Sequence, residues 1–417
     1  MTAGPPARTI PRGINLIDGV AETARGPVDI VLAGERIAAI EVPGVVPAAS
    51  PDDAGDAAAH EVDGRGLTAL PGLIDAHAHY TFDPTEGSLQ AIARRSDAAI
   101  LEAAARHAGI ALRAGVTSAR GAGSIRGLEW ALRDRIAEGR VAGPRLVAAG
   151  IAVGAPDGHG IAFALGAAGA AALATATAEV IERGADVVKV VASEAAMLTT
   201  TGHEPGRIVF GRPELDADEL RAIVEVAHAR GRRVMAHAQD GESVSRCAEA
   251  GVDSVEHAWL ADGRAIETLA RRGTTLVPTL GVTDVNRTLV GLTPVQRERQ
   301  DLIERRHRAS TEAAIRLGVA LATGTDTGEV GVTADHVWRE VAILIDHGAS
   351  PMAALKAATS GGARLLGIVA TTGTLEPGKL ADILVVAGDP LADVTVLSRP
   401  VLVVQAGRRI DPAAAAT

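Results

Sequence analysis

The sequence predicts an α/β fold, a (β/α)8 TIM barrel with a small β-sandwich subdomain built from both chain ends. From about residue 66, short apolar segments alternate with Ala-, Arg- and Glu-rich segments of helical length, which is typical of βα units and a parallel sheet. Eight such apolar segments follow one another, the number that closes a barrel. Short β-rich runs occupy residues 14–42 and return after residue 373, so we expect the two ends to pair.

The predicted order of elements follows from this pattern. Residues 1–65 form the N-terminal part of the β subdomain, residues 66–368 the barrel, and residues 369–417 the C-terminal part of the subdomain. The expected barrel strands are 69–75, 116–120, 145–149, 185–192, 232–237, 252–257, 274–279 and 318–324. The expected helices include 97–114, 126–139, 215–230, 261–272, 298–317 and 335–347.

Composition and charge exclude several classes of protein. The 417 residues are 47% hydrophobic, which is enough for a large core, and the net charge of −10 argues against a nucleic-acid partner. No signal peptide is visible, and the Ala-rich stretch 161–181 carries Glu179, so we expect no membrane contact and a cytoplasmic location. The single Cys247 lies in a helical context and is expected to be a small buried hydrophobe.

A His-x-His pair follows the first predicted barrel strand. His77 and His79 stand in the segment LPGLIDAHAHY. On an extended chain, alternate residues project from the same face, so both imidazoles can bind one ion. The pair alone would also fit two hydrogen-bonded polar histidines, but the carboxyl end of a barrel strand is where barrel active sites lie.

Lys189 is unusual because it interrupts the apolar strand GADVVKVVAS. A bare ammonium buried there would be destabilising or would lose its proton. The chain has only two other lysines, Lys356 and Lys379, and otherwise uses arginine. A neutral amine can take up carbon dioxide and become an anionic carbamate that bridges two cations; the alternative is a lysine whose tip reaches solvent or a carboxylate.

Three more candidate ligands end later strands. His237 (VMAHAQD) and His257 (SVEHAWL) end the fifth and sixth strands, and Asp326 (ATGTDTG) follows the eighth. Each alone would also fit a capping or core polar residue. Because the carboxyl ends of barrel strands meet at one face, the fold brings all six candidates together, and the sequence predicts a metal site there.

These motifs resemble the metal-dependent amidohydrolase superfamily, in its binuclear carboxylated-lysine type, over roughly residues 12–410. LPGLIDAHAH, the lysine strand, the two later histidines, GTD and PGKLADILVV stand in family order. Several other segments look most like the Xaa-Pro/Xaa-Arg dipeptidase-like (prolidase-like) carboxypeptidases. The resemblance implies that one metal is bound by His77, His79 and Asp326, the other by His237 and His257, with carboxylated Lys189 as the bridge.

The resemblance also implies the chemistry. We expect a hydrolase that cleaves an amide C–N bond in a dipeptide, an N-acyl amino acid or a related amide or carbamate, through a metal-bridging hydroxide. Asp326 is the expected catalytic residue, since it can accept the proton of the attacking water and pass it to the leaving amine. Two divalent ions are expected as cofactors, zinc first among them, with CO2 for carboxylation of Lys189.

Substrate specificity is less defined by the sequence. Gln239 stands where the dipeptidase-like subgroup often carries Tyr, which leaves dipeptide specificity open. We expect substrate contacts from His159, Gln239, Tyr80 and Trp259. Phe82 and Phe210 also lie in predicted βα loops, and Arg120, His203, Asp240 and Arg287 are further candidates for binding a substrate carboxylate.

Two other functions stay open at this point. The same site would also serve a lactone, ester or phosphotriester hydrolase, and some proteins of this fold are scaffolds that have lost their metals. The intact ligand set argues against a scaffold. A small-molecule substrate is the expected partner, and barrels of this kind often associate, so we expect a homo-oligomer.

Overall fold

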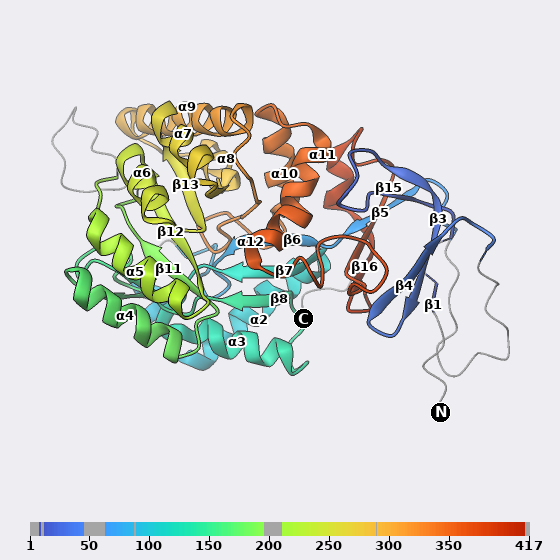
Figure 1. Ribbon diagram of the computed structural model, residues 1–417, viewed down its shortest axis with the longest axis horizontal. Coiled ribbons are helices and arrows are strands. Elements are labelled where there is room, and N and C mark those ends of the chain that lie inside the picture. Colours follow the sequence, from blue (N-terminus) through green and yellow to red (C-terminus); the bar gives the residue numbers. More distant parts are fainter. Residues whose placement is uncertain are drawn as a thin grey trace.

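The structure, a computed structural model, describes residues 8–9, 12–45, 63–86, 89–195, 211–288 and 290–412. Its strands form two groups (Figure 1). One is a mixed sheet of strands from the two ends of the chain, and the other is a set of parallel strands with helices on the outside.

The mixed sheet joins both chain ends. Its strands are β1(Arg8–Thr9), β2(Ile14–Leu16), β3(Arg25–Ala33), β4(Arg36–Glu41), β5(Leu67–Pro71), β15(Ile383–Ala387), β16(Pro400–Gln405) and β17(Arg408–Ile410). The order is β1-β3-β2-β5-β15-β16-β17 with β4 on β3, and only β2 and β5 pair in parallel. The predicted pairing of the chain ends is confirmed. A two-layered sandwich stays a prediction, and so do the exact domain boundaries.

The parallel strands form two sheets. One contains β6(Leu73–Ala78), β7(Val116–Gly121) and β8(Arg145–Ala148); the other contains β9(Ala152–Gly154), β10(Ala164–Gly166), β11(Val187–Val191), β12(Arg233–Asp240), β13(Ser254–Leu260) and β14(Thr275–Val277). Asp186 N donates to Ala148 O (2.9 Å) between β8 and β11. At the other edge, residues 320–327 connect β14 to β6, where Ala76 N donates to Thr323 O (2.8 Å). Hydrogen bonds therefore close the strands into a barrel.

Two predicted barrel strands were wrong in detail. The range 69–75 covers the end of β5 and the start of β6, because the chain leaves the mixed sheet after Pro71 and enters the barrel at Leu73. The range 318–324 holds no regular strand. There the backbone bonds irregularly, and Thr323 N donates to Ala357 O instead of continuing a ladder.

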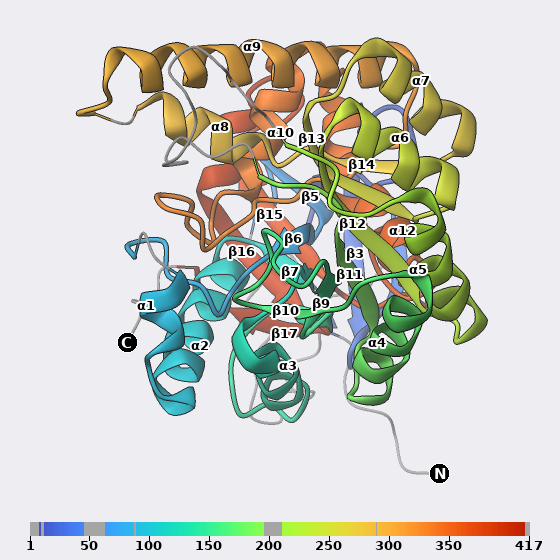
Figure 2. The same ribbon diagram turned by 90° about the vertical axis from the view of Figure 1, so that its left-hand side faces the viewer.

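The helices surround the parallel strands (Figure 2). They are α1(Leu89–Ala93), α2(Asp97–Arg113), α3(Leu128–Ala137), α4(Ala170–Glu182), α5(Ala217–Ala229), α6(Gly241–Ala250), α7(Gly263–Arg272), α8(Leu280–Arg287), α9(Pro294–Arg316), α10(Val337–Asp346), α11(Pro351–Lys356) and α12(Gly362–Leu366). Each predicted helix range is confirmed to within four residues at either end. Within the described ranges, no helix is long and apolar enough to cross a bilayer.

The barrel strands are buried on both faces. Every residue of β6 and β11 is buried, as expected for parallel strands with side chains packed inside and helices outside. The polar side chains within these strands, His77 and Lys189 among them, therefore need partners inside the barrel.

Candidate metal centre

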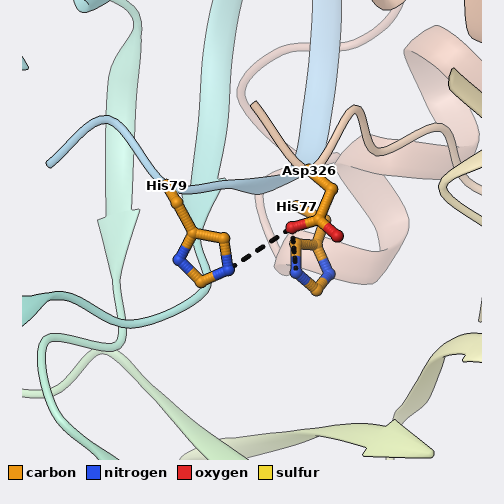
Figure 3. A group of neighbouring side chains, drawn as sticks. All are labelled: His77, His79 and Asp326. Carbon is orange, nitrogen blue, oxygen red and sulfur yellow. Dashed lines mark ion pairs between the residues drawn. The ribbon is translucent and has the colours of Figure 1, made fainter. Parts of the chain in front are cut away.

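Two histidines and one aspartate meet at the carboxyl end of β6 (Figure 3). The Nε2 atoms of His77 and His79 lie 3.3 and 3.4 Å from Asp326 Oδ1. One ligand atom from each residue lies within 4.8 Å of the others, and all three side chains are buried. Imidazole and carboxylate are the ligands that suit zinc and similar ions. The three residues predicted to hold the first metal form a metal-binding group.

Two more histidines adjoin this group. His257 Nδ1 lies 3.8 Å from Asp326 Oδ2, and its ring centre is 5.0 Å from that of His77. The ring of His237 lies 4.5 Å from that of His257. Five of the six predicted metal ligands, from three strands and the 320–327 segment, thus lie in one cluster.

Lys189 lies on β11, beside the strand that carries His237. The register pairs Lys189 with Met235 and Val191 with His237, so Lys189 and His237 share a face. The lysine is 2% exposed, and burial lowers its pKa to about 8, although the charges of Glu256 and Asp326 oppose that shift. The neutral amine is therefore more readily available near neutral pH than that of an exposed lysine.

A left-handed backbone conformation at His257 turns its side chain towards the other histidines of the cluster. The register pairs His237 with Glu256, so strict alternation would point the following His257 to the opposite face. His257 instead has a φ of 74°, and its ring packs against that of His237. Thr279 (φ 54°) and Asp326 (φ 58°) are also left-handed, which is uncommon for residues other than glycine. Backbone strain of this kind gathers at functional sites.

Each of three histidines is oriented by a hydrogen bond at Nδ1. His77 Nδ1 lies 2.8 Å from Glu256 Oε2, His79 Nδ1 is 2.8 Å from the carbonyl of Gly123, and His257 Nδ1 is 2.8 Å from the Thr279 hydroxyl. A carboxylate or carbonyl at Nδ1 accepts its proton and leaves the lone pair on Nε2, as in histidines that bind metals.

Buried nitrogen atoms without partners test the fit to a metal. Among the described residues, His77 Nε2 and His237 Nε2 are buried and have no hydrogen-bond partner. Such atoms are rare in folded proteins and need an explanation. A divalent ion supplies one, because it would take the Nε2 lone pairs together with the Asp326 carboxylate. The residues present therefore fit a metal centre.

Burial sets the charge state of the cluster. It lowers the pKa of His79 to about 3 and the pKa values of His237 and His257 well below the ordinary value, so these imidazoles are neutral. Burial raises the pKa of Asp326, but its contact with His77 outweighs this effect and lowers the pKa to about 2. Neutral imidazole and ionised carboxylate are the forms that bind metals.

The residues predicted to contact substrate lie at different depths. The ring of His159 is 5.0 Å from that of His237, and the ring of Trp259 is 5.6 Å from that of His257, so both lie beside the cluster. Gln239 is buried, and its backbone N–H donates to Ser193 Oγ. Tyr80 is 1% exposed and packs in the hydrophobic core, which favours a packing role for it.

Two candidates for a substrate carboxylate have other roles. Arg120 is buried with Glu256 inside the barrel, where it cannot meet a substrate, and the Asp240 side chain caps helix α6. Arg287 is exposed and lies near Asp284 and Glu304, at 3.5 and 3.4 Å. Two further candidates, His203 and Phe210, lie outside the described residues.

Aromatic rings gather around His79. Phe82 stacks on the His79 ring with centroids 4.3 Å apart and planes 2° apart. Phe163 meets His79 edge-on at 5.8 Å and Phe82 at 5.6 Å. Phe82, which the sequence places in a βα loop, therefore lies beside the site, and so does Phe163, which the sequence did not single out.

Three functional residues escaped the sequence analysis. Glu256 binds His77, Thr279 binds His257, and Asp75 accepts hydrogen bonds from His77 N and from Thr325. A signal was present for Glu256 and Asp75, because each is an acid inside an apolar strand that ends in a histidine ligand. No comparable signal marks Thr279.

Comparison with known proteins agrees with this geometry. A model described as the amidohydrolase family matches residues 68–410. The ochratoxinase of Aspergillus niger is 31% identical over 366 residues, which cover 79% of this chain and 72% of the ochratoxinase. A Xaa-Pro dipeptidase with bound methionine in its active site gives a TM-score of 0.83 at 26% identity, covering 97% of this chain and 100% of that one. A prolidase complexed with N-methylphosphonate-L-proline gives 0.82 at 26% identity, covering 97% and 99%.

Proposed function

The chain belongs to the amidohydrolase family and is a metal-dependent hydrolase, and from this premise we propose that it cleaves an amide C–N bond. The substrate class is a dipeptide, an N-acyl amino acid or a related amide or carbamate. The observation that carries the proposal is the buried His77, His79 and Asp326 group, whose ligand atoms lie within 4.8 Å of one another.

The proposal includes two metal ions, zinc first among the candidates. His77, His79 and Asp326 would hold one, and His237 and His257 the other. The close packing of the His237 and His257 rings against this group supports a second ion next to the first. Histidine and carboxylate ligands suit zinc, and the neutral state of the buried imidazoles favours binding at neutral pH.

Lys189 is proposed to bridge the two ions as a carbamate. Its neutral amine forms an N–C bond to carbon dioxide, one proton is released, and the product is an anion. The pKa of about 8 makes the neutral amine available, and burial disfavours the ammonium. An anion would also offset the positive charge of two metals within an otherwise apolar strand.

Asp326 is the proposed proton carrier of the reaction. Divalent ions held by this cluster would polarise the scissile carbonyl and lower the pKa of water so that water attacks at neutral pH. The Asp326 carboxylate, which lies within 3.8 Å of three imidazoles, would accept the proton of the attacking water at Oδ2 and deliver it to the leaving amine. His159, beside His237, is placed to contact the substrate.

Two observations support an amide substrate with an apolar group. The similar proteins include a Xaa-Pro dipeptidase and a prolidase, whose names denote cleavage of dipeptides. The rings of Phe82 and Phe163 contact His79, and that of Trp259 contacts His257. These rings would favour a substrate with an apolar or aromatic group.

A substrate panel tests the proposal. Amine release is measured from dipeptides, N-acyl amino acids and aryl amides, with lactones, esters and phosphotriesters alongside. The Asp326→Asn variant serves as the blank, and Asp218→Asn, at an exposed carboxylate, is the matched control. We expect turnover of amides that Asp326→Asn loses and Asp218→Asn keeps. Turnover confined to lactones, esters or phosphotriesters would overturn the assignment to C–N bonds.

A further inference from the structure

A buried chain of hydrogen bonds crosses the barrel beneath the metal centre. Glu256 on β13 accepts from His77 Nδ1 on β6 at Oε2, 2.8 Å away. Its other oxygen, Oε1, accepts from Arg120 Nη2 on β7 (2.9 Å) and from the Ser254 hydroxyl (2.5 Å). Glu256 and Ser254 have no exposed surface, and Arg120 is 1% exposed.

Both oxygens of the Glu256 carboxylate accept hydrogen bonds, and the Arg120 guanidinium beside it has further partners of its own. Arg120 donates through Nη1 to Ser254 Oγ at 3.0 Å and through Nε to the Ala76 carbonyl at 2.7 Å, next to His77. The guanidinium, carried by β7, is therefore fixed by hydrogen bonds to two other strands of the barrel, β6 and β13. A buried carboxylate beside a buried guanidinium stays ionised, because each compensates the desolvation of the other.

The hydrogen bond between Glu256 and His77 is not needed for the ion pair between Glu256 and Arg120, and it has a consequence for His77. An ionised carboxylate can only accept hydrogen bonds, so a His77 ring that carries a single proton must have it on Nδ1. Nε2 then carries the lone pair, and this is the atom that lies 3.3 Å from Asp326 Oδ1 and has no hydrogen-bond partner in the described part of the chain. The arrangement fixes both the tautomer and the ring orientation of one ligand.

We propose that Glu256, held by Arg120, is the positioning residue that makes His77 a metal ligand. The inference rests on the proposed metal-dependent function and adds a residue to it. Glu256 does not touch the metal or the substrate; it acts through His77. Since outer partners of histidine ligands typically contribute about 10- to 100-fold to metal affinity, the effect is measurable.

The substitution Glu256→Gln tests this directly, because it keeps the size of the side chain. Its amide has one acceptor atom. When the amide oxygen faces His77, the amide NH2 faces the Arg120 guanidinium; when the NH2 faces His77, it forces the proton to Nε2 and blocks the ligand atom. Both arrangements are unfavourable, so we expect zinc affinity at one site to fall about 10- to 100-fold.

A second variant separates positioning from folding. In Arg120→Met/Glu256→Gln, no buried charge is left unpaired, so the barrel should fold, yet His77 still lacks its carboxylate. Glu129→Gln is the matched control, because Glu129 is also a buried acid but accepts from the backbone N–H of Gly150 rather than from a histidine.

The measurement is equilibrium zinc affinity and stoichiometry of the metal-stripped full chain, with the absorption spectrum of the cobalt-loaded protein as a report on ligand geometry. Urea unfolding of the metal-free proteins monitors the fold. The inference predicts weaker binding and an altered cobalt spectrum in both Glu256→Gln variants, and wild-type zinc binding in Glu129→Gln. Wild-type zinc affinity in the folded double variant would refute it. If the wild-type chain bound no metal, the proposed function would fail as well, so the two failures are distinguishable.

Discussion

Lys189 is the residue on which the proposed two-metal centre depends. Lys189→Ala removes the amine proposed to form the bridge, so we expect one metal ion per chain to be lost. Amide hydrolysis should fall by more than the roughly 10- to 100-fold typical of an outer partner. Metal content by mass spectrometry and kcat/KM measure the two effects.

The chain offers a matched control for this substitution. Lys356 pairs with Glu22 away from the barrel mouth, so Lys356→Ala removes an ammonium without touching the cluster. Full activity and unchanged metal content in Lys189→Ala would contradict the bridging role.

At the residue scale, the sequence was informative where ligands follow strands. His77, His79 and Asp326 could be predicted because a His-x-His pair and an aspartate end strands that meet at one face. Thr279 could not, because its role depends on which atoms meet across the barrel, and the sequence marks Glu256 as an acid within an apolar strand without indicating that it contacts His77. The inward turn of His257 depends on a positive φ that alternation alone does not predict.

At the scale of elements, the approach of the 320–327 segment to β6 depends on Gly324. A Cβ at this position would lie 2.5 Å from Val277 Cγ1 and 2.6 Å from His77 Cβ. Gly324→Ala should therefore displace His77, destabilise the fold by about 1–3 kcal/mol and weaken zinc binding. Urea unfolding of the metal-free protein and zinc titration measure these effects.

Gly263 provides the comparison for that prediction. A Cβ there meets nothing within 4 Å, and the residue begins helix α7. Gly263→Ala should be neutral or slightly stabilising. Equal stability of the Gly324→Ala and Gly263→Ala variants would show that the close approach is unimportant.

The elements themselves were largely predictable from the sequence. The alternation of apolar and Ala-, Arg- and Glu-rich segments located the six helices that were given ranges and most barrel strands, because periodic burial leaves a clear pattern. It failed at residues 69–75, where one apolar run serves two sheets with a break after Pro71. It also failed at 318–324, because the backbone hydrogen bonds of this segment do not form a regular ladder.

At the scale of the whole molecule, buried titratable groups set how stability depends on pH. The pKa of His79 is about 3 in the folded protein, against about 6.5 when unfolded. Burial raises the pKa values of Glu256 and Asp326, but Arg120 outweighs it at Glu256 and His77 outweighs it at Asp326, so both pKa values are about 2. All three groups bind protons more readily in the unfolded chain, so their contribution is present above the unfolded pKa and is lost on acidification.

Two other buried acids act in the opposite direction. Burial raises the pKa values of Glu129 and Glu340 to about 8, so the folded protein keeps their protons and their contribution is lost as pH rises towards 8. We expect the urea midpoint of the metal-free protein to fall steeply below pH 4.5 and gently from pH 6.5 to 8.5. Glu129→Gln should flatten only the alkaline decline. A midpoint that did not change from pH 5.5 to 3.5 would contradict these assignments.

The central claim is that the residues gathered at the carboxyl ends of the barrel strands hold two metal ions for amide hydrolysis. The most direct test is to strip the protein with a chelator, add zinc in known ratios in the presence of bicarbonate, and follow amine release from the best amide of the panel. The account predicts no turnover without zinc and a rate that rises to a plateau at two equivalents per chain. Turnover that persists in the stripped protein, or that reaches its plateau at one equivalent, would contradict it.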